Sequence, residues 1–507
     1  MTRQARALLL TLIILQTLLL TIAARPPLAP AAPIARASAA ATPTLAPAAT
    51  PALPVITGNP ALDRAERVAL EVLAGNQTEV GHRAAPFYKG LWIRDSFAWG
   101  MVPNDSGTLS TYAGSELRYW LAHQQPSGSW VTFEYSGWYD ETPILIAAVL
   151  DAYRLTGDIG MVRRALPALR RGWNWLHGRY IDRRHGSSCL LWASVRPQGD
   201  HWAADWADQV ARPGYNPQLE GLWYRATHAM YALELLAGSR TAAVTDAHVA
   251  SCIAHDANTT LWRVDAPAHL DARPLAPFGH YGARPAGRDY FEVDGNALLV
   301  AASVATPAHR ASVLGEVAAQ QRYLLGGDGG GPARVVYGDY APEDYGAIHN
   351  WMAPGRYQSA YWPSVGGLLA IAAARNDDIA TSAAVLNGLA RRGADISNGF
   401  YEWYAADGTP GGASLYGWGA RMYLLALYRA YLGVDDSMSI GHPADLVLRA
   451  APGPGRGALV RLGRHITIIG HGRGRFRYAR LNGRLWRSFT IPARLLRDGM
   501  VVDVYRG

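Results

Sequence analysis

The chain has 507 residues, of which 49% are apolar and 17% charged, so it can bury a large core and should be mostly globular. Its net charge of +8 is unevenly spread: residues 440–507 hold thirteen arginines against three aspartates, whereas residues 56–439 are net acidic. The residue clusters with functional character lie in the acidic part, which excludes a nucleic-acid-binding protein.

The N-terminus has the pattern of an export segment. Arg3 and Arg6 precede an uncharged apolar run over 7–24, a length that fits a cleaved signal peptide or a membrane anchor. Residues 25–55 are mostly Ala, Pro and Thr, which predicts an extended linker without a core. We therefore expect the protein to be secreted, or tethered to the membrane by residues 1–24, and to act outside the cytoplasm.

The central segment, 56–439, is predicted to be helical. Asn59-Pro60 reads as a cap followed by a proline at the first helical position. Apolar residues recur at helical spacing over 62–73, 92–101, 108–123, 142–156, 159–178, 219–238, 244–262, 295–306, 308–324, 359–375, 379–392 and 412–432. Twelve antiparallel helices in six hairpins can close into an (α/α)6 toroid, six inner helices surrounded by six outer ones. A helical solenoid is the competing architecture, but the sequence has no fixed-period repeat.

The C-terminal segment, 440–507, has a different texture. Short alternating or clustered apolar runs at 446–448, 458–460, 465–469, 476–478 and 501–504 predict strands. Leu481-Asn-Gly483 is a hairpin signal. We expect a small β-sandwich whose arginines form a solvated face, with the holding of an acidic polymer or the cell envelope as an alternative.

Six clusters of aromatic and acidic residues recur near the predicted helix starts. Carboxylates perform acid/base chemistry, and flat aromatic rings cover the apolar faces of sugars, so this combination predicts a sugar-processing cleft. The clusters are Trp92-Ile-Arg-Asp95, Trp138-Tyr-Asp-Glu141-Thr-Pro143, Asp205-Trp-Ala-Asp208, Asp294-Gly-Asn296, Tyr357-Gln-Ser-Ala-Tyr-Trp362-Pro363 and Tyr401-Glu402-Trp403.

Glycoside hydrolysis needs a general acid and a base or nucleophile. Asp208 is the predicted acid, because neighbouring tryptophans should disfavour its ionised form, and Glu402 is the predicted base. Asp140 and then Asp205 are rival acids. The structural alternatives are a helix N-cap for Asp208 and a mere hydrogen-bonding partner for Glu402.

Other motifs have simpler interpretations. Asp294 and Asn296 are expected to cap the helix near Gly295. Trp362-Pro363 is either a helix start with a packed ring or a sugar-stacking site. Cys189 and Cys252 either form one disulfide or remain buried thiols. Neither a metal site nor a cofactor is predicted, since the sequence shows no metal-ligand spacing and no phosphate-binding or dinucleotide motif.

These residues resemble motifs of (α/α)6-barrel glycoside hydrolases. Trp92-Ile-Arg-Asp95-Ser is similar to the Trp-x-Arg-Asp motif of glucoamylases, in which the Arg-Asp pair holds the hydroxyls of the terminal sugar. Tyr139-Asp-Glu-Thr-Pro-Ile-Leu-Ile146 resembles a segment of amylo-α-1,6-glucosidases. Trp206-Ala-Asp208 and Tyr401-Glu402-Trp-Tyr, with Tyr416-Gly-Trp418, resemble the segments that carry the general acid and general base in family 63 processing glucosidases. The chain lacks the Trp-Glu-Glu segment of glucoamylases, and Glu-Asn-Tyr is Glu-Trp-Tyr here.

The resemblance implies an exo-acting, inverting hydrolase, most specifically an α-glucosidase on the non-reducing ends of oligo- or polysaccharides. Arg94 and Asp95 would grip the terminal sugar. The implied substrate-binding residues are Trp92, Arg94, Asp95, Tyr139, Asp140, Glu141, Trp206, Gln218, Glu220, Trp223, Tyr357, Gln358, Trp362, Trp403 and Trp418. The rivals are a polysaccharide lyase using Tyr361 and His349, and a glycan-binding protein without activity.

Overall fold

The computed structural model describes residues 54–104, 112–131, 139–181, 189–193, 205–207, 210–264, 270, 278–282, 289–345, 355–394, 399–435 and 442–507. Every described residue belongs to one compact unit, which spans Leu45–Gly507. The predicted export segment lies outside the described residues. Within the described part, none of the helices combines the length and the apolarity needed to cross a membrane.

The predicted helices are present, with boundaries shifted by a few residues, and the mainly helical class is confirmed. Asn59 accepts a hydrogen bond from the Ala61 amide at 3.0 Å and so caps the first helix, which begins at Pro60 as predicted. The α-helices are α2 (Pro60–Asn76), α3 (Ile93–Phe97), α4 (Leu117–Ala122), α5 (Glu141–Thr156), α6 (Ile159–Tyr180), α7 (Pro217–Ala237), α8 (Arg240–Asp256), α9 (Val293–Ala301), α10 (Pro307–Leu325), α11 (Pro363–Arg375), α12 (Ile379–Gly388) and α13 (Gly417–Ala426).

Six of these helices contact one another in a closed cycle. Helix α3 contacts α5, and the contacts continue through α7, α9, α11 and α13 back to α3. Every residue of α9 and of α13 is buried, which fits helices that are apolar on all sides and covered all round. The remaining helices pack outside this inner ring: α2 on α13, α4 and α6 on α5, α8 on α7, α10 on α9, and α12 on α11.

Close approach within the ring depends on small residues. A Cβ at Gly367 of α11 would lie 2.9 Å from the carbonyl oxygen of Met422 in α13, so only glycine allows these two helices to approach so closely. In the same way, a Cβ at Gly295 of α9 would lie 2.8 Å from the Gln218 amide nitrogen at the start of α7. The inner helices therefore pack backbone against backbone near their beginnings as well as along their lengths.

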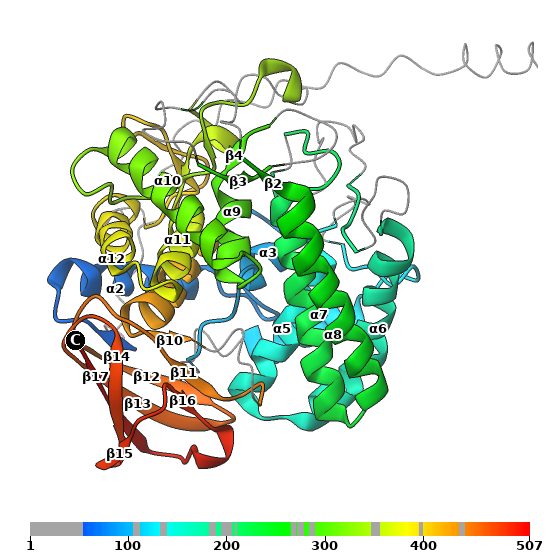
Figure 1. Ribbon diagram of the computed structural model, residues 1–507, viewed down its shortest axis with the longest axis vertical. Helices are drawn as coiled ribbons and strands as arrows, with labels where there is room; N and C mark the ends of the chain where they lie inside the picture. The colour runs from blue at the N-terminus through cyan, green and yellow to red at the C-terminus, as the bar shows by residue number, and fades with distance from the viewer. Residues whose placement is uncertain are drawn as a thin grey trace, which may run out of the picture. The chain divides into compact units, whose positions relative to one another are not determined.

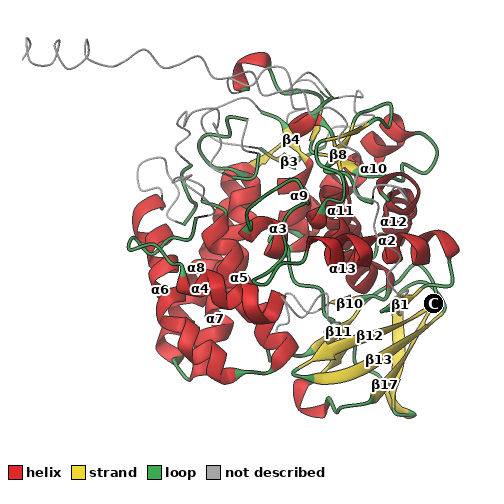
Figure 2. Ribbon diagram, turned by 180° about the vertical axis from the view of Figure 1, so that it is seen from behind, coloured by secondary structure: helices red, strands yellow, loops and turns green. Residues whose placement is uncertain are grey.

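Short strands lie at the N-terminal ends of the inner helices. Strand β4 runs directly into α9 and pairs with β6, while β7 runs into α11 and pairs with β5 and β8. Figure 2 shows β3, β4 and β8 together at one end of the helical part. These two-residue strands are β2 (Trp262–Arg263), β3 (His280–Tyr281), β4 (Phe291–Glu292), β5 (Ala333–Arg334), β6 (Val336–Tyr337), β7 (Tyr361–Trp362), β8 (Trp403–Tyr404) and β9 (Pro410–Gly411).

The C-terminal region is built of strands, as predicted, and Figure 1 shows them gathered beyond the helices. A six-stranded sheet has the order β1-β12-β13-β17-β14-β15, and a three-stranded sheet has the order β10-β11-β16. Their strands are β1 (Val55–Ile56), β10 (Val434–Asp435), β11 (Leu446–Leu448), β12 (Gly455–Arg461), β13 (Arg464–His471), β14 (Phe476–Leu481), β15 (Arg484–Trp486), β16 (Thr490–Ile491) and β17 (Met500–Arg506).

Two details of the C-terminal sheets bear on the predictions. Asn482 and Gly483 both have positive φ, 48° and 83°, which gives the predicted two-residue hairpin between β14 and β15. Strand β1 lies at the predicted boundary between linker and helical part, yet it pairs antiparallel with β12. The C-terminal sheet thus takes its edge strand from the segment that precedes the first helix.

Candidate active site

Glu402 lies in the loop that leads into β8, and the fold holds its carboxylate from two sides. Its side chain is 4% exposed; Oε2 accepts hydrogen bonds from the Ala413 amide at 3.0 Å and from the Tyr88 hydroxyl at 3.2 Å. Two donors fix the orientation of a carboxylate that retains capacity to accept a further hydrogen bond. Tyr88 is not among the residues predicted from the sequence; its place four residues before Trp92 was the available signal.

The two residues predicted to hold the terminal sugar, Arg94 and Asp95, lie in α3, and we call this pair the sugar grip. Arg94 and Asp95 are buried in this helix, which begins directly after Trp92. The Arg94 guanidinium lies 3.6 Å from Asp140 Oδ1, 3.8 Å from Glu141 Oε1, and 5.8 Å from the centroid of the Trp92 ring. Two of the predicted clusters, at the starts of α3 and α5, therefore meet at one cation.

Arg421 of α13 fixes the backbone of this grip. It is fully buried, and its guanidinium donates to the carbonyl oxygens of Asp95 at 2.8 Å, Ala98 at 3.1 Å and Gly100 at 2.7 Å. A five-residue helix such as α3 has little stability of its own. Arg421 satisfies carbonyls that the short helix leaves free and joins the first and last inner helices.

Burial keeps two of these carboxyl groups easier to protonate than usual. Burial raises the pKa of Asp95 to about 6, against the lowering effects of a hydrogen bond from Tyr416 and of the Arg94 charge. Burial also raises the pKa of Asp140; Arg94 opposes this shift, while Glu141 and Asp205 add to it. Asp140 can therefore hold a proton at a pH at which an exposed aspartate cannot.

Tyr416 connects the sugar grip to the base. Its side chain is 5% exposed. Burial raises the pKa of its hydroxyl well above the usual range, and the nearby carboxylates of Asp95 and Glu402 add to the shift. The start of α13 thus lies near the sugar grip and near the proposed base; the motif Tyr416-Gly-Trp418 includes this tyrosine, but the sequence analysis assigned it no role.

A second charged group, centred on Arg212, lies beneath the 205–207 segment. Arg212 contacts Asp205 at 3.2 Å, Glu292 at 2.9 Å and Asp294 at 3.1 Å, and Tyr340 accepts a further hydrogen bond at 3.0 Å. Burial lowers the pKa of Arg212, but the three carboxylates outweigh burial and raise it well above its usual range. This network fixes Asp205, one of the rival acids, as an ion-pair partner.

The interpretation of Asp294 and Asn296 as helix caps is wrong. Asp294 lies within the first turn of α9, where it pairs with Arg212 and accepts a hydrogen bond from Trp206 Nε1 at 2.8 Å. Asn296 instead bonds to the backbone of Tyr281, donating at 2.9 Å and accepting at 2.8 Å. Both side chains bond to residues that are distant in the sequence, and the periodicity of a helix cannot predict such partners.

Three of the predicted tryptophans pack together. The Trp206 ring lies 4.9 Å from that of Trp362 and 5.4 Å from that of Trp418, and all three are at most 3% exposed. Gln358 is fully buried and donates to the Trp206 carbonyl at 3.4 Å. Trp362, next to the start of α11, is thus a packed ring, and the three rings bring together the 205–207 segment and the starts of α11 and α13.

The remaining predicted binding residues fall into two groups. Trp92, Tyr357 and Trp403 are half-buried, so their side chains are partly accessible to solvent. Tyr139 is 7% exposed and its ring packs edge-on against Tyr180 at 4.4 Å.

Three residues predicted to follow the acid have structural contacts. Trp223 is fully buried, its ring 5.5 Å from that of Trp173, and its Nε1 donates to the Cys189 carbonyl. Glu220 accepts from the Leu191 amide at 3.0 Å, and burial raises its pKa well above the usual range. Gln218 is 2% exposed at the start of α7. Trp223 and Glu220 thus both contact the 189–191 segment, and their predicted role beside the acid stays a prediction.

The predicted acid, Asp208, lies outside the described residues, as do Trp138 and the rival lyase residue His349. The helix that follows in the chain, α7, begins at Pro217, and its cap is Asn216, whose side chain accepts from the Gln218 amide at 2.9 Å. Asn216 also donates to Asp205, which ties this cap to the Arg212 network.

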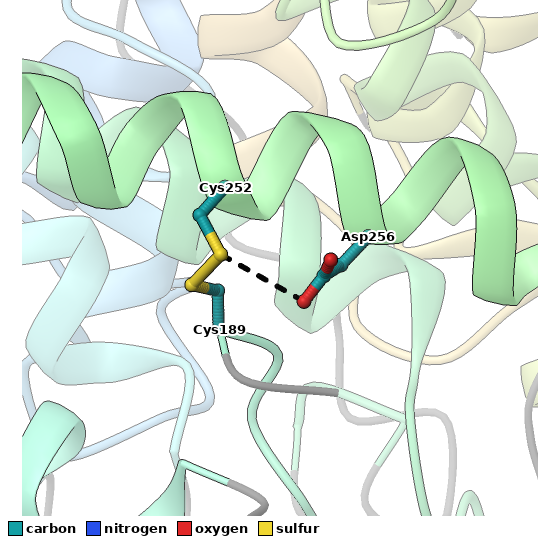
Figure 3. A group of neighbouring side chains, drawn as sticks. All are labelled: Cys189, Cys252 and Asp256. Atoms are coloured by element: carbon teal, nitrogen blue, oxygen red, sulfur yellow. Dashed lines mark hydrogen bonds between the residues drawn. A yellow bond between two sulfur atoms is a disulfide. The ribbon is translucent and has the colours of Figure 1, made fainter. Parts of the chain in front are cut away.

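Cys189 and Cys252 form a disulfide, the outcome that the sequence left open. The bond joins the segment before α7 to α8, and Figure 3 shows Asp256 one helical turn beyond Cys252. These three residues are the one group in the described part with the proximity needed to hold a metal ion, but both sulfur atoms are committed to the disulfide.

Comparisons with known proteins show similarity of fold. No protein-family profile matches the sequence, and no curated protein matches it significantly. A GH78-family rhamnosidase from Bacillus sp. GL1 superimposes with a TM-score of 0.55 at 15% identity, over 83% of this chain and 42% of that one. The chain thus spans less than half the length of this rhamnosidase.

Two further structures come from Thermus thermophilus. An uncharacterized conserved protein gives a TM-score of 0.51 at 17% identity, over 71% of this chain and 99% of that one. A GH63 mannosylglycerate hydrolase in complex with Tris and D-glycerate gives 0.49 at 16% identity, over 71% and 99%. The resemblance of the chain to the barrel glycoside hydrolases is thus confirmed at the level of the fold.

Proposed function

We propose that the protein is an exo-acting, inverting glycoside hydrolase built on an (α/α)6 toroid, and that its substrate is an α-glucoside at the non-reducing end of an oligo- or polysaccharide. The closed cycle of contacts from α3 to α13 supports the toroid. The fold shared with a GH78-family rhamnosidase supports the reaction class. We further propose that the enzyme works outside the cytoplasm, exported by its N-terminal segment.

One observation carries the proposal: Tyr88 lies between the proposed base and the residues proposed to grip the sugar. Its hydroxyl donates to Glu402 Oε2 at 3.2 Å, and its ring contacts that of Trp92, over which the Arg94 guanidinium lies at 5.8 Å. A sugar whose hydroxyls are held by Arg94 and Asp95 would therefore have its reacting carbon near Glu402. Because the grip is buried, it favours a terminal sugar, and hence exo action.

In the proposed reaction Asp208 protonates the glycosidic oxygen while Glu402 removes a proton from the attacking water. Inversion requires the two carboxyl groups to be about 6.5–9.5 Å apart, which leaves room for that water. Asp140 is the second candidate for the acid, supported by its raised pKa and by its complete burial beside Arg94.

The lyase alternative is weaker. It requires Tyr361 to abstract a proton, but Tyr361 lies in β7, paired on both sides, and is only 2% exposed. The carboxylates around Arg94 and Arg212 would also repel a polyuronate. A glycan-binding protein without activity would keep the grip but would not turn over substrate.

The test uses the full-length chain with α-glucosides of varied linkage, while proton NMR follows the anomer that is released first. We expect β-glucose, and loss of activity in both Asp208→Asn and Glu402→Gln by about 10²–10⁴-fold. Glu79→Gln, at an exposed glutamate, is the matched control. Loss in Asp140→Asn with an active Asp208→Asn variant would move the acid to Asp140.

Release of α-glucose would contradict the inverting mechanism, but the protein would still be a glycoside hydrolase. If no glycoside of any sugar is turned over, although glycans bind, the protein is a binding protein and the proposed activity is wrong.

A further inference from the structure

A cavity of about 590 Å³ lies where the helical part meets the C-terminal strands. One wall comes from α10 and from the turn between α11 and α12, and the other comes from two loops of the C-terminal region. Figure 1 shows α10, α11 and α12 on the same side of the helical part. The cavity is lined by Pro307, Arg310, Ala311, Leu314, Gly315, Arg375, Asn376, Asp377, Asp378, Arg449 and Arg475.

Four of the lining residues are arginines, contributed by separate elements. Arg310 belongs to α10 and Arg375 ends α11, whereas Arg449 and Arg475 belong to the arginine-rich C-terminal segment. The lining aspartates are already engaged: Asp377 pairs with Arg475 at 3.0 Å, and Asp378 caps α12 by accepting from the Thr381 amide at 3.1 Å. The lining therefore carries two more positive than negative charges.

Arg375 is the best-defined part of the cavity. Its side chain is only 6% exposed and donates to Asp435 Oδ1 at 2.5 Å, while Arg449 Nε lies 3.6 Å from Asp435 Oδ2. The Nε groups of Arg375 and Arg449 are buried and make no hydrogen bond with any described residue. A buried donor without an acceptor is unfavourable, so an additional acceptor at this place would stabilise it.

The cations are also crowded. Burial lowers the pKa of Arg375; Asp435 opposes this shift, but Arg429 and Arg449 add to it. One buried carboxylate thus faces three guanidinium groups. The Arg310 side chain has neither a hydrogen bond nor an ion pair within the described part of the chain, so it is available to a ligand.

We propose that this cavity binds a small ligand through an oxyanion group, a carboxylate or a phosphate. Its volume falls within the range of about 300–1,000 Å³ usual for small-molecule sites. Guanidinium groups bind such oxyanions through paired, charge-assisted hydrogen bonds. The ligand would contact Arg310 and Arg375 from the helical part and Arg449 and Arg475 from the C-terminal region, and so join the two. It is a separate site from that of Glu402 and does not depend on the proposed activity.

The experiment is isothermal titration of the full-length chain with inorganic phosphate and with glucuronate, with glucose as the uncharged probe. We expect saturable binding of at least one anion and no binding of glucose. The double variant Arg310→Gln/Arg475→Gln should weaken binding at least about tenfold, since each charged hydrogen bond contributes about that factor. Neither residue is fully buried, so the variant should fold.

The control is Arg484→Gln/Arg487→Gln, which removes the same charge from exposed positions in and after β15. It should leave the dissociation constant unchanged. Equal weakening in both double variants would mean nonspecific attraction to a basic protein and would overturn the site, as would the absence of saturable binding for both anions. Binding of phosphate alone or of glucuronate alone would identify the oxyanion.

Discussion

The hydroxyl of Tyr88 donates to Glu402 Oε2 at 3.2 Å and lies 3.4 Å from Oε1, across 314 positions of the sequence. Tyr88 follows Phe87, a residue that is 76% exposed, and the Tyr88 ring meets that of Trp92 edge-on at 6.5 Å. The aromatic segment before α3 therefore borders both the proposed base and the sugar grip. Substitution of Tyr88 tests whether Glu402 depends on a fixed orientation of its carboxylate.

Tyr88→Phe should lower kcat by about 10–100-fold with little change in KM, because a hydrogen bond to a charged carboxylate is worth about 1.5–3 kcal/mol. Steady-state kinetics on the best glucoside measures both constants. Tyr323→Phe, at a tyrosine that is 65% exposed on α10, should have no effect. An unchanged kcat in Tyr88→Phe would mean that Glu402 needs no such support or is not the base.

Arg421→Lys should destabilise the chain by about 3–5 kcal/mol, since the backbone carbonyls of the α3 segment would lose their buried donor. Urea unfolding measures the change. Arg456→Lys, at an exposed arginine of β12, should stay within about 0.5 kcal/mol of the parent. If Arg421→Lys unfolds at the same urea concentration as the parent, the connection between α13 and α3 does not contribute to stability.

Because the pKa of buried Glu66 is raised, we expect the stability of the protein to depend on pH. Burial raises its pKa to about 8; the hydrogen bond from the Val55 amide opposes this, and Asp63 adds to it. Between about pH 4.5 and pH 8 the unfolded state ionises this carboxyl while the folded state keeps it protonated, so the folded state loses stability as pH rises.

Glu66→Gln removes this titration. From pH 5 to pH 8 its free energy of unfolding should improve relative to the parent by about 2–4 kcal/mol, in urea unfolding measured at both pH values. Glu79→Gln, at an exposed residue, should show no such trend. A parent whose stability is flat from pH 5 to pH 8, with Glu66→Gln in parallel, would contradict a protonated Glu66.

The disulfide between Cys189 and Cys252 closes a loop with a sequence separation of 63. Its removal in Cys189→Ser/Cys252→Ser should cost about 2–4 kcal/mol, because the unfolded chain regains freedom. Dithiothreitol should lower the free energy of unfolding of the parent by the same amount. It should leave that of the double variant unchanged. If the reductant acts equally on both proteins, the bond contributes nothing.

Much of the helical part could be predicted because its signals are local. The cap at Asn59, the apolar periodicity of α5 and α7, and the turn at Asn482-Gly483 each depend on a few neighbouring residues. The strands of the C-terminal region were also predicted, from alternation. Clusters of acids and aromatic residues marked where the inner helices begin.

The partners within the site could not be predicted, because they come from distant parts of the chain. Nothing near Asp294 in the sequence points to Arg212, and nothing near Asp95 points to Tyr416. The contact of the Trp223 ring with Trp173, which lies 50 positions earlier, is equally invisible in the sequence around Trp223. Likewise, the edge strand at Val55 depends on a partner in β12, at the other end of the chain.

Because α13 closes the inner ring, the sugar grip can form only after α13 has been synthesised. A ribosome delivers Arg94 and Asp95 early, but the guanidinium that fixes their backbone belongs to Arg421, 326 positions after Asp95. No nascent fragment that ends before α13 can contain a finished sugar grip. If the chain crosses a membrane in unfolded form, the sugar grip is therefore completed only after α13 has crossed.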